Sequence, residues 1–136
     1  MKTLAAWCAA ALLCATAPAS HADGWLPLPK VPQALGRPAW NVPGGDPQRG
    51  QALISRMGCA GCHTIPGIAG ADGNVGPPLT RIGDRIFIAG VLRNTPENMV
   101  HWVQHPQSVV PGNAMPEMGI TEAQARDIAS YLYTLR

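Results

Sequence analysis

The sequence predicts a small all-α domain in which three main helices are joined by ordered loops. Three stretches carry apolar residues at helical spacing, and each begins at a residue type that commonly caps a helix. No stretch shows the alternation of apolar and polar residues that marks a strand. The 136 residues include 15 glycines and 14 prolines, which favour short helices and irregular connections. This length suits one compact domain, so a single core must carry the function.

The first 22 residues are typical of an export signal. Lys2 precedes an uncharged apolar run over residues 4–17, which is shorter than the roughly 18 to 20 residues of a membrane-spanning helix. We expect cleavage after Ala22, with Ala19 as the second choice, and retention as a membrane anchor is the alternative. Cleavage would leave a periplasmic protein that has no stable insertion in the membrane.

Removal of the export signal would leave two cysteines in the chain. Cys8 and Cys14 lie within the apolar run and would leave with it, so the exported chain keeps only Cys59 and Cys62. In an oxidising compartment two such close thiols would form a disulfide with each other unless they react with another group.

The charge of the chain is close to balanced. Ten Lys and Arg side chains oppose eight Asp and Glu side chains, and removal of Lys2 with the signal leaves nine against eight. Surfaces that bind nucleic acid need a strong excess of basic residues, so nucleic acid is excluded as a partner. The same balance predicts only modest salt sensitivity when a partner protein docks.

Residues 23–45 form a proline-rich arm. Five prolines stand among Trp25, Trp40 and small residues, a composition that favours an extended conformation over a helix. The arm is either a flexible leader or a segment whose tryptophans anchor it on the domain or on a partner. We expect the compact domain to occupy residues 46–136.

The first helix and the loop that follows it have clear local signals. Asp46 and Pro47 combine a capping residue with a proline at the first helical position, which predicts a helix over residues 47–58. Gly58 then allows a sharp turn. Between residues 64 and 90 glycine and proline recur too often for a long element. We therefore expect an ordered loop there that wraps around a flat prosthetic group.

Two further helices complete the domain. Thr95 and Pro96 repeat the signal of a cap followed by proline, and they predict a helix over residues 95–106 that Pro106 terminates. Thr121 and Gln124 fit a capping box, which predicts a last helix over residues 121–136.

The five residues from Cys59 to His63 match the pattern C-x-x-C-H, which is typical of covalent attachment of a c-type haem. Two cysteines at this spacing on a turn can each form a thioether with a vinyl group at the porphyrin edge, while His63 offers its imidazole to the iron. The small Ala60 and Gly61 let the backbone lie close to the ring. We therefore predict one covalent haem c.

Other uses of this motif fit the sequence less well. A thioredoxin-like dithiol requires a strand-to-helix setting, whereas this motif follows a predicted helix and precedes a loop. A structural zinc site needs further ligands, and only His101 and His105 could join the two cysteines. No pairing of a nucleophile with a base indicates hydrolysis or group transfer, so we do not expect an enzyme.

The iron needs a sixth ligand, for which Met115 is the best candidate. It stands in the turn-rich stretch 111–116, where flanking prolines would stiffen a loop that aims a thioether at the iron. Met118 is the main rival, whereas Met57 and Met99 lie on predicted apolar helix faces. His101 and His105 share one helix face and are more simply explained as solvated side chains.

Taken in order, these residues resemble a class I cytochrome c over residues 45–136. The resemblance implies that His63 is the proximal iron ligand and Met115 the distal one. It also implies that the Pro77 carbonyl accepts a hydrogen bond from His63 and that Trp102 lies in the haem pocket, where the family often has a tyrosine. The contact between the first and last helices would involve Gly50, Ile54, Ile128 and Tyr131.

The stretch from His63 to Met115 is also similar to the cytochrome c domain fused to subunit II of some bacterial terminal oxidases. This resemblance implies a periplasmic single-electron carrier that passes electrons between respiratory complexes or to a terminal oxidase, with redox proteins such as an oxidase or a dehydrogenase as donor and acceptor. Two alternatives stay open. The chain could be a haem subunit of a larger oxidoreductase complex, or a haem enzyme or sensor whose methionine ligand is displaced.

Overall fold

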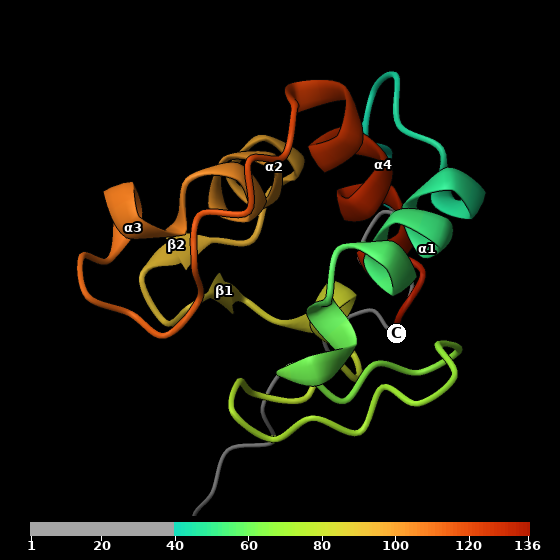
Figure 1. The fold of residues 1–136 in the computed structure, drawn as a ribbon. Helices are drawn as coiled ribbons and strands as arrows, with labels where there is room; N and C mark the ends of the chain where they lie inside the picture. The colour runs from blue at the N-terminus through green and yellow to red at the C-terminus, as the bar shows by residue number, and fades with distance from the viewer. Residues whose placement is uncertain (1–39) are drawn as a thin grey trace, which may run out of the picture. The chain divides into compact units, whose positions relative to one another are not determined.

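The computed structural model of the chain describes residues 40–136 (Figure 1). The predicted export signal with Cys8 and Cys14, and the proline-rich arm as far as residue 39, lie outside the described residues. The described part of the arm is packed on the domain. The ring of Trp40 lies 6.1 Å from the ring of Tyr133, and the neighbouring Val42 is part of the buried core.

Most of the regular secondary structure in the described residues is helical, which confirms the predicted fold class. The α-helices are α1 (Pro47–Arg56), α2 (Pro96–Gln104), α3 (Pro106–Val109) and α4 (Glu122–Leu132). Two short 3₁₀ turns, η1 (Cys59–Gly61) and η2 (Ile82–Asp84), and two short strands, β1 (Phe87–Ile88) and β2 (Leu92–Arg93), lie in the connections. Within residues 40–136 no helix has both the length and the apolar character needed to cross a membrane.

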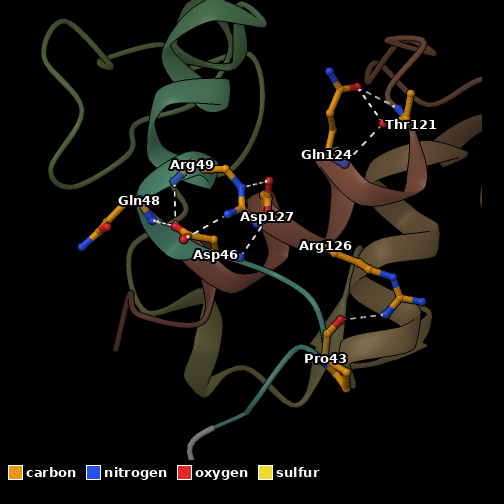
Figure 2. A network of polar contacts seen from close by, with 8 residues as sticks. All are labelled: Pro43, Asp46, Gln48, Arg49, Thr121, Gln124, Arg126 and Asp127. Atoms are coloured by element: carbon orange, nitrogen blue, oxygen red, sulfur yellow. Dashed lines mark hydrogen bonds and ion pairs between the residues drawn. The ribbon is translucent and has the colours of Figure 1, made fainter.

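The predicted helix caps are present as hydrogen bonds. The Asp46 carboxylate accepts from the backbone N–H groups of Gln48 and Arg49, and Thr95 caps α2. Thr121 and Gln124 form the reciprocal capping box at the start of α4 (Figure 2). Each cap accepts from an N–H group that the first helical turn leaves without a partner, which explains why these helices begin where the sequence indicates.

Three details differ from the sequence prediction. Pro106 follows the end of α2, as expected, but it also begins the four-residue helix α3, because a proline suits the first position of a new helix. The antiparallel strands β1 and β2 were not predicted, since pairs of two residues are too short to show alternation. The first and last helices end earlier than predicted, at Arg56 and Leu132.

Helices α1 and α4 lie side by side, and α2 also packs against α4 (Figure 1). The contact of α1 with α4 is centred on Gly50, where an added Cβ would lie only 2.0 Å from the carbonyl oxygen of Asp127. The predicted helix contact is therefore present, with Ile54 and Ile128 buried in the same core. Tyr131 is also buried, and its hydroxyl donates to the carbonyl of Pro66 at 2.6 Å, which ties α4 to the long loop.

A polar network fastens the same two helices at the surface (Figure 2). The Asp127 carboxylate accepts from Arg49 Nε at 2.9 Å and Nη2 at 2.8 Å, and from the backbone N–H of Asp46 at 2.8 Å. Nearby, Arg126 Nη1 donates to the carbonyl of Pro43, which ties the described end of the arm to α4. The start of α1 is thus fixed on α4 by one carboxylate.

This network predicts a pH-dependent stability. The hydrogen bonds from Arg49 hold the pKa of the Asp127 carboxyl below its ordinary value. The stabilisation from Asp127 is therefore complete above about pH 4 and is lost as the pH falls through the lowered pKa of the folded state. Replacing Asp127 by asparagine should lower the free energy of unfolding at pH 7 by about 1 to 2 kcal/mol, because the partner guanidinium is largely in water. Denaturant titrations at pH 7 and pH 3 check this, and an equal loss at both pH values would contradict it.

Candidate haem site

The C-x-x-C-H motif lies on a tight turn directly after α1. Gly58 adopts a left-handed conformation with φ of 78°, and the 3₁₀ turn η1 follows at once. Cys59 and Cys62 are both free thiols and both half-buried. Burial raises the pKa of the Cys59 thiol. A redox-active dithiol needs a lowered thiol pKa, so both the helix-to-loop setting and the protonated sulfur argue against that use of the motif.

The imidazole of His63 is held by the loop that follows it. Its Nδ1 lies 2.8 Å from the carbonyl oxygen of Pro77, which is the contact that the resemblance implied. Because a carbonyl only accepts, Nδ1 must donate in this contact, and in the neutral imidazole this tautomer leaves the lone pair on Nε2. The backbone N–H of Gly76 donates to the carbonyl of Cys62 at 2.8 Å, so the same loop is also pinned to the motif. This arrangement suits a histidine that binds a metal through Nε2.

Two glycines make this close packing possible. A Cβ added at Gly76 would lie 2.2 Å from Cε1 of His63, so the imidazole lies directly against the backbone there. A Cβ added at Gly73 would lie 2.6 Å from the carbonyl carbons of Gly61 and Cys62. The role of Gly73 was not predicted, because one glycine among several in a loop carries no local signal of what it faces.

Met115 lies in the loop between α3 and α4 and is half-buried. Two side chains fix its backbone. Gln107 Nε2 donates to the carbonyl of Met115 at 2.7 Å, and the Met115 N–H donates to Asn113 Oδ1 at 2.8 Å. Hydrogen bonds therefore organise the loop that holds His63 and the loop that carries Met115 separately. Within residues 40–136 none of these bonds joins the two loops. Sequence reasoning gave no role to Gln107 or Asn113.

The four methionines of the described part have different surroundings. Met99 is buried, and Met57 and Met118 are half-buried and packed against the core. Met115 is outside this apolar cluster although it is also partly buried. Core packing accounts for the other three thioethers and leaves that of Met115 without a packing role.

The remaining predicted residues fall into two groups. Trp102 is half-buried and packs against the core, as do Leu79 and Leu92. His101 and His105 are exposed, and their rings lie near each other, with centroids 5.7 Å apart and planes tilted by 54°. Within residues 40–136 no three His, Cys, Asp or Glu side chains gather in a way that could hold a metal ion.

The donor set fits a covalent haem c. Two free thiols stand three positions apart on a turn, and the next residue is an imidazole whose Nε2 is available. Gly76 leaves room for that imidazole where a larger residue would not.

Known proteins resemble part of this chain. It is 35% identical over 89 residues to cytochrome c oxidase subunit 2 of Alkalihalophilus pseudofirmus, a match that covers 65% of this chain and 25% of the relative. It is 34% identical over 93 residues to the protein of the same name from Bacillus sp. strain PS3, with 65% and 26% covered. The chain therefore spans about a quarter of the length of these oxidase subunits.

A shorter relative matches almost from end to end. Cytochrome c2 of Rhodopila globiformis is 30% identical over 108 residues, which cover 71% of this chain and 99% of the relative. The family model for cytochrome c matches residues 47–136, a range that runs from the first residue of α1 to the last residue of the chain and includes both halves of the site. The chain therefore belongs to the cytochrome c family, in its class I form.

Proposed function

We propose that the chain is a periplasmic single-electron carrier with one haem, attached through Cys59 and Cys62 and ligated by His63 and Met115. Membership of the cytochrome c family makes it a haem electron carrier. The observation that carries the finer proposal is the hydrogen bond of His63 Nδ1 with Pro77, because it leaves Nε2 for the iron on the residue next to the second thiol.

The choice of Met115 as distal ligand is supported by elimination among the thioethers. Met57, Met99 and Met118 are occupied in core packing, whereas Met115 lies outside that core on a loop whose backbone is hydrogen-bonded on both sides. With protein ligands on both faces, no position is open for a substrate, and a carrier is favoured over a haem enzyme or sensor.

The chain's own residues would tune the transfer. Haem, when bound, supplies a one-electron couple whose potential rises with a thioether ligand and an apolar surround. Pro77 orients the His63 ring and increases its basicity through the hydrogen bond at Nδ1. Trp102 and further apolar side chains would exclude water, and this set consists of Ile68, Leu79, Phe87, Leu92 and Val109.

The proposal also includes the redox proteins that donate electrons to the chain and accept electrons from it. Two of the relatives are named as subunits of cytochrome c oxidase, which supports a terminal oxidase as acceptor, with a second redox protein such as a dehydrogenase as donor. The near balance of basic and acidic side chains supports a docking contact that depends only modestly on salt. Residues 1–22, with their export-signal pattern, support a periplasmic location.

Mass spectrometry and spectroscopy of the exported protein test this function. We expect the added mass of one haem, an N-terminus at Asp23, and a sulfur-to-iron charge-transfer band in the oxidised protein. Replacing both Cys59 and Cys62 by serine should remove the covalent haem. A wild-type chain without added haem mass would overturn the proposal.

A matched pair of methionine variants tests the distal ligand. Met115→Ala should lose the charge-transfer band and bind small ligands such as imidazole readily, because the iron then has an open position. Met118→Ala should keep the band, since that thioether packs against the core. Loss of the band in Met118→Ala alone would assign the ligand to Met118, and its absence from the wild type would favour a haem enzyme or sensor.

A further inference from the structure

We propose that Gln107 is a positioning residue that holds the Met115 loop closed, so that the thioether stays on the iron. The inference rests on the proposed function, in which Met115 is the distal ligand. Gln107 would not touch the iron. It would act through the backbone of the loop.

The side chain of Gln107 bonds to three backbone groups of that loop. Its Nε2 donates to the carbonyls of Asn113 at 2.9 Å and Met115 at 2.7 Å, and its Oε1 accepts from the N–H of Gly112 at 3.0 Å. Both ends of the amide are therefore used. One side chain from α3 spans the loop from its turn at Gly112, where φ is 79°, to the methionine itself.

Asn113 completes the arrangement from inside the loop. Its Nδ2 donates to the carbonyls of Pro106 at 2.9 Å and Val110 at 2.6 Å, and its Oδ1 accepts from the Met115 N–H at 2.8 Å. The Met115 backbone is thus held at its N–H by Asn113 and at its carbonyl by Gln107. All these bonds lie within residues 106–115, so they need no haem to form.

Such a loop has a direct effect on ligand exchange. A thioether is a weak ligand, so its lifetime on the iron depends on how often the backbone that carries it moves away. The three bonds of Gln107 must break before Met115 can swing out, because they end on Gly112, Asn113 and Met115 itself. Removing them should increase the fraction of open loop about tenfold or more, since each net hydrogen bond is worth up to a factor of about ten.

Imidazole binding to the oxidised holoprotein measures this opening, because imidazole reaches the iron only when Met115 has left. We expect Gln107→Ala to raise the limiting rate of imidazole binding about tenfold or more over the wild type. Gln107→Glu retains the shape and one acceptor for the Gly112 N–H, but it lacks the two donors. Gln107→Glu should bind imidazole faster than the wild type by a similar factor. It replaces the alanine variant in this test if the alanine variant does not fold.

Gln51→Ala is the matched control. Gln51 also fixes a loop through its amide, with Nε2 donating to the carbonyl of Gly67 at 2.9 Å, but that loop does not carry Met115. This variant should bind imidazole at the wild-type rate. A general loss of stability would accelerate imidazole binding in Gln51→Ala as well as in the Gln107 variants. A positioning role accelerates imidazole binding only in the Gln107 variants.

The outcomes separate the two proposals. If the wild type shows the charge-transfer band and both Gln107 variants bind imidazole at its rate, the positioning role is wrong and the ligation by Met115 stands. If the wild type lacks the band, Met115 is not the ligand and both proposals fail. An equal acceleration in Gln51→Ala would also overturn the role assigned to Gln107.

Discussion

Replacing Gly76 by alanine is expected to remove most of the haem-loaded protein. The added Cβ would lie 2.2 Å from Cε1 of His63 and 2.7 Å from its Nδ1, far inside any real contact distance. Relief requires the imidazole or the loop to move, and either movement breaks the hydrogen bond of Nδ1 with the Pro77 carbonyl. Gly76 is also fixed through its N–H to Cys62, so the loop has little freedom to retreat.

The yield and spectrum of the purified protein measure this effect. We expect Gly76→Ala to accumulate at about a tenth of the wild-type holoprotein level or less, because misplacement of His63 would remove the proximal ligand proposed above and would expose the variant to proteolysis. Asn74→Ala is the control in the same loop, since Asn74 is exposed and lies two residues from the glycine. A Gly76→Ala protein with wild-type yield and spectrum would show that His63 does not hold the position described.

Helix starts are well predicted from the sequence because their causes are local. Asp46, Thr95 and Thr121 each cap a helix within three residues of their own position. The ion pair of Asp127 with Arg49 joins side chains 78 positions apart, and no local sequence pattern predicts it. The buried Asn94, which follows β2, is likewise held by tertiary contacts, since its side chain donates to the carbonyls of Ile82 and Arg85 and accepts from the Tyr133 hydroxyl.

The same division applies to the site. Cys59, Cys62 and His63 belong to one short motif whose chemistry dictates its spacing, so sequence reasoning predicts their role directly. The contact of Gln107 with Met115 joins helix α3 to a loop residue eight positions later, and that of Gly76 depends on where an imidazole lies. Residues that orient other residues carry no signature of their own, because glutamine and glycine are ordinary in any loop.

Gly50 provides the second large effect, this time on the fold. Helix propensity alone predicts that Gly50→Ala stabilises α1 by about 1 kcal/mol. The packing predicts the opposite sign, because the new Cβ would lie 2.0 Å from the carbonyl oxygen and 2.6 Å from the carbonyl carbon of Asp127 on α4. Backbone atoms cannot turn aside as a flexible side chain does. We therefore expect Gly50→Ala to lower the free energy of unfolding by about 3 kcal/mol or more.

Ala52→Gly in the same helix separates the effect of helix propensity from the effect of helix packing. Ala52 is exposed, so its replacement changes helix propensity with little change in packing and should cost about 1 kcal/mol. Chemical denaturation of both holoproteins should thus rank Gly50→Ala as the less stable, which is the reverse of the ranking by propensity. The separation of α1 from α4 in Gly50→Ala should also weaken the bonds from Arg49 to Asp127, so the Gly50 variant should lose the acid-dependent part of its stability. If Gly50→Ala proves more stable than the wild type, the close contact of these helices is not as described.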